Sequence, residues 1–137
     1  MKILIINGPN LNLLGKRETH LYGEMSFEDY FEQLRKKYAD LEYFQSNIEG
    51  EIIEKLQKNN ADAAVLNAGG YTHTSVSIRD AVSAIKKPVI EVHITNISSR
   101  EPFRHESLIS PVAQGCIFGF GLKGYDLALD YLINYHS

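Results

Sequence analysis

Two pairs of residues in this sequence have side chains that could exchange protons with a bound molecule. Arg17 and Tyr22 lie close together in a glycine-punctuated segment, residues 7–23. A free tyrosine titrates near pH ~10, and a neighbouring guanidinium favours the phenolate, so this pair could supply a base closer to neutral pH. Glu91 and His93 end an apolar run. Because side chains alternate along a strand, both point to the same side, where the carboxylate could orient the imidazole.

Each pair also has a purely structural interpretation. His93 could be a hydrogen-bonded core histidine, and Tyr22, one of eight tyrosines, could only anchor a loop. The length of segment 7–23 favours a functional lid over a passive connection. The place of His93 at the end of a strand favours an acid or base. Together these features suggest an enzyme.

Two further segments could bind an anion. Residues 67–75 read N-A-G-G-Y-T-H-T-S, where adjacent glycines allow close approach of the backbone and the free N–H groups of a helix start favour negative charge. The same pattern fits a tight turn followed by a hydroxyl N-cap. Arg100 and Arg104 could clamp a carboxylate bidentately, although such a charged run is often only a solvated loop.

Short apolar segments alternate with amphipathic segments along the whole chain. We expect strands at residues 3–7, 41–45, 63–66, 89–93 and 116–120. We expect helices that begin near Ser26 with a hydroxyl cap, and then at residues 49–58, 78–85 and 125–133. This alternation predicts one α/β domain over residues 1–137. Its fold would be flavodoxin-like and doubly wound, with a five-stranded parallel sheet covered by helices on both faces.

The polar candidates fall at the same end of the predicted strands. Asn7 and Asn10 follow the first strand, Asn67 follows the third and His93 ends the fourth. Ligands of doubly wound folds bind outside the carboxyl ends of the strands. We therefore expect these side chains to share one site.

Composition excludes several classes of protein. A net charge of −3 argues against non-specific nucleic-acid binding, and no apolar stretch approaches the length of a membrane span. The single cysteine, Cys116, excludes an internal disulfide and favours a cytoplasmic setting; we expect it to be buried core filler. The five histidines are scattered, so no metal site is expected. No nicotinamide or ATP fingerprint is present.

Non-catalytic modules of the same fold are the rival interpretation. A phospho-receiver needs an acidic cluster after the first strand and an aspartate after the third, whereas this chain has Asn7, Asn10 and Asn67. A flavin-binding electron carrier needs a hydroxyl-rich phosphate loop, which residues 8–11 lack. These residues exclude both interpretations. A degraded, substrate-binding relative of an enzyme would be expected to lose Tyr22 or His93, and both are present.

Five motifs, taken in order, closely resemble the type II 3-dehydroquinate dehydratase family. They are NGPNLNLLGKRETHLYG, QSNIEGE, NAGGYTHTSVSIRDA, EVHITN and REPFRHESLISPVAQG. The resemblance implies reversible dehydration of 3-dehydroquinate to 3-dehydroshikimate in the shikimate pathway of aromatic amino acid biosynthesis. It implies an anti elimination through an enolate, with no metal, cofactor or Schiff base.

The resemblance also assigns roles in catalysis. Tyr22 would remove the proton alpha to the ketone, and Arg17 would hold this tyrosine as phenolate. Asn10, with an ordered water, would stabilise the enolate. His93 would protonate the departing hydroxyl as general acid, with its orientation set by Glu91.

The resemblance further assigns residues that bind the substrate. Asn67, His73 and Arg104 would hold its hydroxyls, while Ile94 and Thr95 would bind its carboxylate largely through backbone N–H groups. The family also implies a homododecamer, a tetramer of trimers. In that assembly Asp80 would reach the site of a neighbouring subunit.

Three positions depart from the family pattern. Thr95 stands where serine is usual, and its extra methyl is expected to cost little affinity. Thr19 replaces a common proline, so we expect the backbone there to be less restricted. Glu106 stands where histidine is common and adds negative charge. Because none of these is a proton-transfer residue, we expect activity to be retained.

Overall fold

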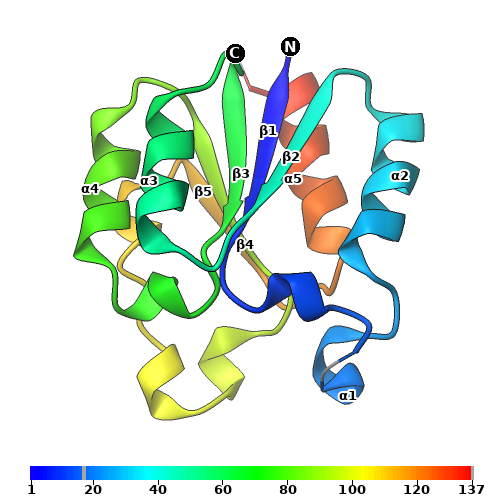
Figure 1. Ribbon diagram of the computed structural model, residues 1–137, viewed down its shortest axis with the longest axis vertical. Coiled ribbons are helices and arrows are strands. Elements are labelled where there is room, and N and C mark those ends of the chain that lie inside the picture. Colours follow the sequence, from blue (N-terminus) through cyan, green and yellow to red (C-terminus); the bar gives the residue numbers. More distant parts are fainter. Residues whose placement is uncertain (17, 137) are drawn as a thin grey trace.

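A parallel sheet forms the centre of the protein in the computed structural model, which describes residues 1–16 and 18–136. Its five strands lie in the order β2-β1-β3-β4-β5 (Figure 1). They are β1 (Ile3–Asn7), β2 (Leu41–Gln45), β3 (Ala63–Asn67), β4 (Val89–His93) and β5 (Gly115–Phe118). The order reverses direction between β1 and β3, as in a flavodoxin-like doubly wound sheet. The predicted fold class is therefore confirmed.

Helices cover both faces of this sheet. Helices α2 (Phe27–Lys37) and α5 (Lys123–Asn134) lie on one face, and α3 (Glu49–Gln57) and α4 (Val76–Ala84) lie on the other (Figure 1). A short helix, α1 (Thr19–Tyr22), lies beyond the carboxyl ends of the strands. Among the described residues, no helix has both the length and the apolar content needed to cross a bilayer.

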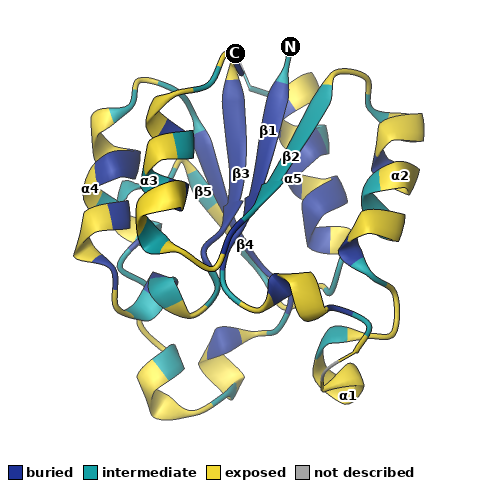
Figure 2. Cartoon of the chain, in the orientation of Figure 1, coloured by how far each residue is buried: buried dark blue, intermediate teal, exposed yellow. Residues whose placement is uncertain are grey.

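The strands are apolar on both sides because both sides are covered. In β1 the side chains of Ile3 and Ile5 pack in the cluster that includes residues of α2 and α5. Leu4 and Ile6 pack in the cluster that includes residues of α3 and α4. The residues of β1, β3 and β4 are buried throughout, which makes the centre of the sheet rigid (Figure 2). The polar residues at the strand ends are thus held on a fixed frame.

Two helix starts have the caps that the sequence predicts. The Ser26 hydroxyl accepts a hydrogen bond from the Asp29 N–H at 3.2 Å, and the Ser75 hydroxyl accepts one from the Ile78 N–H at 2.9 Å. Each cap satisfies one of the N–H groups that a helix leaves free at its start. The first helical residue of α1 is Thr19, a place where proline would suit the helix.

The fifth strand differs from its predicted range of residues 116–120. It runs from Gly115 to Phe118 and ends before Gly119, whose φ of 90° takes the backbone out of the extended conformation. The expectation that Cys116 is buried is wrong: this residue is exposed. The reason is the position of β5 at the edge of the sheet, where an apolar strand has only one neighbouring strand, β4.

A buried aspartate joins the two helices on one face of the sheet. The carboxylate of Asp126, in the first turn of α5, accepts a hydrogen bond from Lys37 Nζ at 2.8 Å and another from the Tyr30 hydroxyl, both on α2. Burial alone would raise the pKa of Asp126, but the hydrogen bonds from Lys37 and Tyr30 outweigh it and lower this pKa. This contact fixes α2 against α5.

Replacing Asp126 by Ala should lower the free energy of unfolding by about 1–3 kcal/mol, because the Tyr30 hydroxyl and Lys37 would lose their common acceptor. Urea unfolding followed by circular dichroism measures the change. Asp130→Ala is the matched control, since Asp130 lies one turn later and, among the described residues, accepts a hydrogen bond only from Asn134 of its own helix. Equal losses for the two variants would show that the Asp126 contact stabilises nothing.

Candidate active site

A cavity of about 140 Å³ lies at the carboxyl edge of the sheet. Most of the residues that the sequence marks as candidates line it: Asn10, Tyr22, Asn67, His73, His93, Ile94, Thr95 and Arg104. A larger and more open hollow of about 700 Å³ lies beside Phe44 and Ile48, but only carboxylates and lysines accompany its apolar lining. The smaller cavity is therefore the candidate active site.

Two candidate residues lie outside the cavity lining, and a third is not among the described residues. Glu91 lies behind His93, fully buried, and reaches the cavity only through that histidine. Asp80 lies on the exposed side of α4 and does not line the cavity. Arg17, the predicted partner of Tyr22, lies outside the described residues.

The phenol of Tyr22 is held by an arginine from the loop that follows β4. Arg100 Nη1 donates a hydrogen bond to Tyr22 Oη at 2.8 Å, and the guanidinium carbon lies 5.7 Å from the centre of the Tyr22 ring. Only 13% of the Arg100 side chain is exposed, so water screens this contact little. His105 Nε2 lies 2.8 Å from the backbone oxygen of Arg100 and helps to place the loop. Arg100 is thus a charged donor placed directly on the phenol oxygen of Tyr22.

The sequence left two interpretations of Arg100 and Arg104 open, a clamp for a carboxylate or a solvated charged loop, and gave no sign of a contact with Tyr22. In the structure Arg104 lines the cavity and forms an ion pair with Glu101 at 3.1 Å, whereas Arg100 contacts Tyr22. A contact between residues 78 positions apart has no signal in one sequence, because loop packing decides it.

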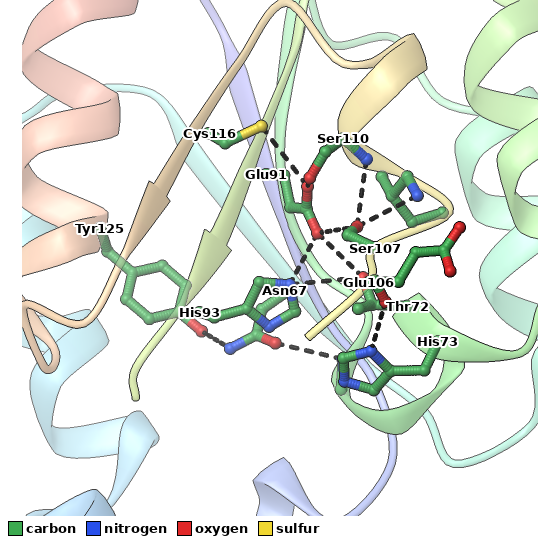
Figure 3. A network of polar contacts seen from close by, with 12 residues as sticks. Asn67, Thr72, His73, Glu91, His93, Glu106, Ser107, Ser110, Cys116 and Tyr125 are labelled. Atoms are coloured by element: carbon green, nitrogen blue, oxygen red, sulfur yellow. Dashed lines mark hydrogen bonds and ion pairs between the residues drawn. The ribbon is translucent and has the colours of Figure 1, made fainter. Parts of the chain in front are cut away.

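Glu91 and His93 point to the same side of β4, as strand alternation predicts. His93 Nε2 lies 2.7 Å from Glu91 Oε2 (Figure 3). Burial alone would raise the pKa of Glu91, but the hydrogen bond and charge of His93, with hydrogen bonds from Ser107 and Ser110, outweigh it and lower this pKa to about 2. Glu91 is therefore a carboxylate at neutral pH, and its oxygen is an acceptor for the imidazole beside it.

His73 presents one nitrogen to a backbone carbonyl. Its Nδ1 donates a hydrogen bond to the backbone oxygen of Glu106 at 2.8 Å, so Nε2 carries no proton in the neutral ring. Burial lowers the pKa of His73 and the hydrogen bond to Glu106 opposes this only in part. His73 is thus suited to accept a hydrogen bond. The Glu106 carboxylate extends away from His73 and His93 (Figure 3).

A buried tyrosine connects the ends of β1 and β3. Tyr125 Oη, from α5, donates a hydrogen bond to Asn7 Oδ1 at 2.7 Å and accepts one from Asn67 Nδ2 at 3.0 Å. Asn67 Oδ1 accepts a further hydrogen bond from the Gly69 N–H at 3.1 Å. The amide of Asn67 is therefore oriented before any ligand binds. Sequence reasoning missed Tyr125, which it placed only in the apolar stripe of the last helix.

The turn after β1 is packed tightly against the turn after β3. A Cβ added to Gly8 would lie 2.5 Å from the backbone oxygen of Ala68, so no larger residue fits there. Asn10, two residues after Gly8, has a φ of 68° and its N–H donates a hydrogen bond to Asn47 Oδ1 at 3.0 Å. Left-handed backbone is tolerated by asparagine more readily than by most residues. This packing brings Asn10 to the cavity.

Comparison with known proteins gives one consistent result. The family model described as "Dehydroquinase class II" matches residues 1–133. The chain is 53% identical to a 3-dehydroquinate dehydratase of Francisella philomiragia, over 98% of this chain and 96% of that protein. It is 52% identical to one from a Nitratiruptor species, over 94% of this chain and 86% of that protein.

Solved structures agree with the sequence relatives. The crystal structure of a type II dehydroquinase from Butyrivibrio crossotus superposes with a TM-score of 0.92 at 48% identity, covering 96% of this chain and 97% of that chain. The structure of a type II dehydroquinase from Propionibacterium acnes gives a TM-score of 0.86 at 40% identity, covering 96% and 94%. The similarity therefore includes the whole sheet and its covering helices.

The ionised state of Glu91 should make the fold sensitive to acid. Its pKa is lowered from 4.5 to about 2 on folding, so its contribution to stability is full above the unfolded value and is lost as the pH falls through this window. Between about pH 6 and about pH 3, the free energy of unfolding in urea should fall less steeply for Glu91→Gln than for the parent chain. Glu54→Gln, at an exposed pair with Lys58, should keep the parent slope. An unchanged slope in Glu91→Gln would contradict the assignment.

Proposed function

The chain belongs to the class II dehydroquinase family, and on this premise we propose that it catalyses the reversible dehydration of 3-dehydroquinate to 3-dehydroshikimate. The observation that carries the proposal is the pair of proton-transfer groups at one cavity. Tyr22 lies against Arg100, and His93 lies against Glu91. An elimination beside a ketone requires a base and an acid. Here the base would be a phenolate stabilised by a cation, and the acid an imidazolium stabilised by an anion.

The first proposed step removes a proton from the carbon next to the ketone. Tyr22, as phenolate, accepts this proton, and the electrons of the C–H bond move into the enolate. Arg100 favours the phenolate through the 2.8 Å hydrogen bond, and Arg17 is proposed to act on the same tyrosine. The enolate oxygen is stabilised by Asn10, which lines the cavity, together with an ordered water.

The second proposed step expels the hydroxyl on the adjacent carbon. The enolate electrons form the carbon–carbon double bond, the C–O bond breaks, and the proton of His93 leaves with the oxygen as water. Glu91 stabilises the protonated imidazole before this transfer. We propose that Tyr22, from α1, and His93, from β4, act from opposite sides of the substrate, in an anti elimination.

The remaining residues of the cavity are proposed to hold the substrate. The oriented amide of Asn67, the unprotonated Nε2 of His73 and the guanidinium of Arg104 suit its hydroxyls. Backbone N–H groups of Ile94 and Thr95 are proposed to bind its carboxylate. The proposed steps need no metal or cofactor.

Assembly and location extend the proposal. Asp80 lies on an exposed side of α4, in keeping with its proposed contact to the site of a neighbouring subunit. We propose a homododecamer built as a tetramer of trimers, acting in the cytoplasm. The proposed partner is the small-molecule substrate, with no nucleic acid or membrane involved. Analytical ultracentrifugation tests the assembly directly.

The base assignment is tested by removing one oxygen atom. Purified protein given 3-dehydroquinate should produce the ultraviolet absorption of a conjugated enone, and Tyr22→Phe should lower kcat by about 10²–10⁴-fold while the fold persists. Tyr135→Phe is the matched control, because Tyr135 is 72% exposed. If Tyr22→Phe keeps most of its rate, another group is the base.

The role of Arg100 is tested separately. Arg100→Gln should lower kcat by about 10–100-fold, because a charge-assisted hydrogen bond to the phenolate is lost. KM should change little, and Arg35→Gln, at an exposed helix position, should match the parent enzyme. A rise in KM with kcat unchanged would instead assign Arg100 to the substrate carboxylate.

A further inference from the structure

The carboxylate of Glu91 is surrounded by more donors than the histidine pair requires. Oε2 accepts hydrogen bonds from the hydroxyls of Thr72 at 3.0 Å and Ser107 at 2.6 Å, besides its contact with His93. Oε1 accepts one from the Ser110 hydroxyl. Thr72, Ser107 and Ser110, which we call the hydroxyl cluster, come from two separate segments and converge on this buried group (Figure 3).

The proton of the Ser107 hydroxyl has only one available direction. Its oxygen accepts hydrogen bonds from the backbone N–H groups of Ile109 and Ser110, each at 3.1 Å. The hydroxyl proton is then left to point at Glu91 Oε2. A protonated Glu91 would need an acceptor, whereas Ser107, whose oxygen already accepts two hydrogen bonds, offers only a donor. The cluster therefore suits a carboxylate and disfavours a carboxylic acid.

The second ring nitrogen of His93, Nδ1, is available to the cavity. Nε2 contacts Glu91 at 2.7 Å and Thr72 Oγ1 at 3.3 Å, while Nδ1 has no hydrogen-bond partner within residues 1–16 and 18–136. In the same part of the chain, no fully buried side-chain nitrogen or oxygen lacks a partner. Nδ1 must then be accessible, and His93 lines the cavity.

We propose that Thr72, Ser107 and Ser110 are positioning residues, whose hydroxyls hold Glu91 as an acceptor-only carboxylate. This carboxylate binds the Nε2–H of His93 and leaves Nδ1 as the atom that donates its proton to the departing hydroxyl. After the transfer His93 is neutral, and the hydroxyls keep stabilising the charge on Glu91. The inference rests on the proposed role of His93 as the acid.

The hydroxyl cluster should raise the acid strength of the pair. Hydrogen bonds to a carboxylate favour its charged form, most of all when the neighbouring imidazole has lost its positive charge. Fewer hydroxyls should therefore make the pair hold its proton to higher pH. The other titratable or charged groups around the pair are His73, Cys116, Tyr22, Arg100 and Arg104, and they are the same in the variants below.

The segment that carries Ser107 and Ser110 has other anchors. The Leu108 N–H donates a hydrogen bond to the Thr72 backbone oxygen at 2.8 Å, and Arg79 Nη1 donates one to the Leu108 backbone oxygen at 3.0 Å. Ile109 is fully buried in the core. Removing the Ser110 hydroxyl should thus leave the segment in place. Ser107 is left intact in the test, because its oxygen also caps two backbone N–H groups.

The test uses Thr72→Val, Ser110→Ala and the double variant. The titration of His93 is followed by ¹⁵N NMR of the histidine rings in full-length protein without substrate, and kcat and KM are measured across pH. In the double variant we expect the midpoint of the His93 titration to rise by about one pH unit. The pH at which kcat falls on the alkaline side should rise by about the same amount. We expect kcat at neutral pH to fall by about ten-fold with KM within about two-fold.

Controls separate a positioning role from a structural one. Ser110→Thr keeps the hydroxyl and should restore both readouts, and Ser83→Ala, at an exposed position of α4, should match the parent protein. If the double variant does not fold, each single variant should show part of the shift. An unmoved His93 midpoint, with or without a loss of kcat, would overturn the inference. Because that titration needs no turnover, its outcome is distinct from a failure of the proposed reaction.

Discussion

Parallel pairing of β1, β3 and β4 is the constraint on which the rest of the site depends. In this register Asn7 lies beside Asn67, and Leu66 lies beside Glu91, so the polar ends of three strands meet at one edge. The frame is rigid because both faces of these strands are buried under helices. Tyr125 then connects Asn7 and Asn67 with hydrogen bonds of 2.7 and 3.0 Å. A shift of one residue in either strand would turn these side chains to the opposite face.

The same frame carries a charge in the interior. An isolated carboxylate at the position of Glu91 would be costly, since the residue is fully buried. Hydrogen bonds from His93 and from nearby hydroxyls outweigh that cost, and the pKa of Glu91 falls to about 2 rather than rising. The charge is thus available to an acid at the cavity. Burial also separates it from water, which strengthens its effect on His93.

The two groups proposed to transfer protons, His93 and Tyr22, are held by different kinds of structure. His93 ends a central strand, whereas Tyr22 ends the four-residue helix α1, outside the sheet. The Tyr22 ring packs partly against the core, and Arg100 reaches it from the loop after β4. That loop also carries Arg104 into the cavity and is fastened to Thr72 through Leu108. Two loops and one sheet edge therefore have to meet before the site is complete.

The sequence by itself determined the elements and the local pairs. Apolar periodicity predicts the strands and helices, Ser26 predicts a helix cap, and strand alternation predicts that Glu91 and His93 face the same side. These features depend on residues close in the chain, where bond geometry sets the spacing. Proximity to Arg17 made Tyr22 a candidate base, but its proposed role of removing the proton beside the ketone came through the family resemblance.

Only the tertiary structure decided which residues contact one another across separate segments. The contact of Arg100 with Tyr22, the hydroxyls of Thr72, Ser107 and Ser110 around Glu91, and the link through Tyr125 all join residues distant in sequence. The exposure of Cys116 has the same origin, because composition does not say which strand lies at the edge. Such contacts follow from how loops and helices pack, and packing depends on the whole chain at once.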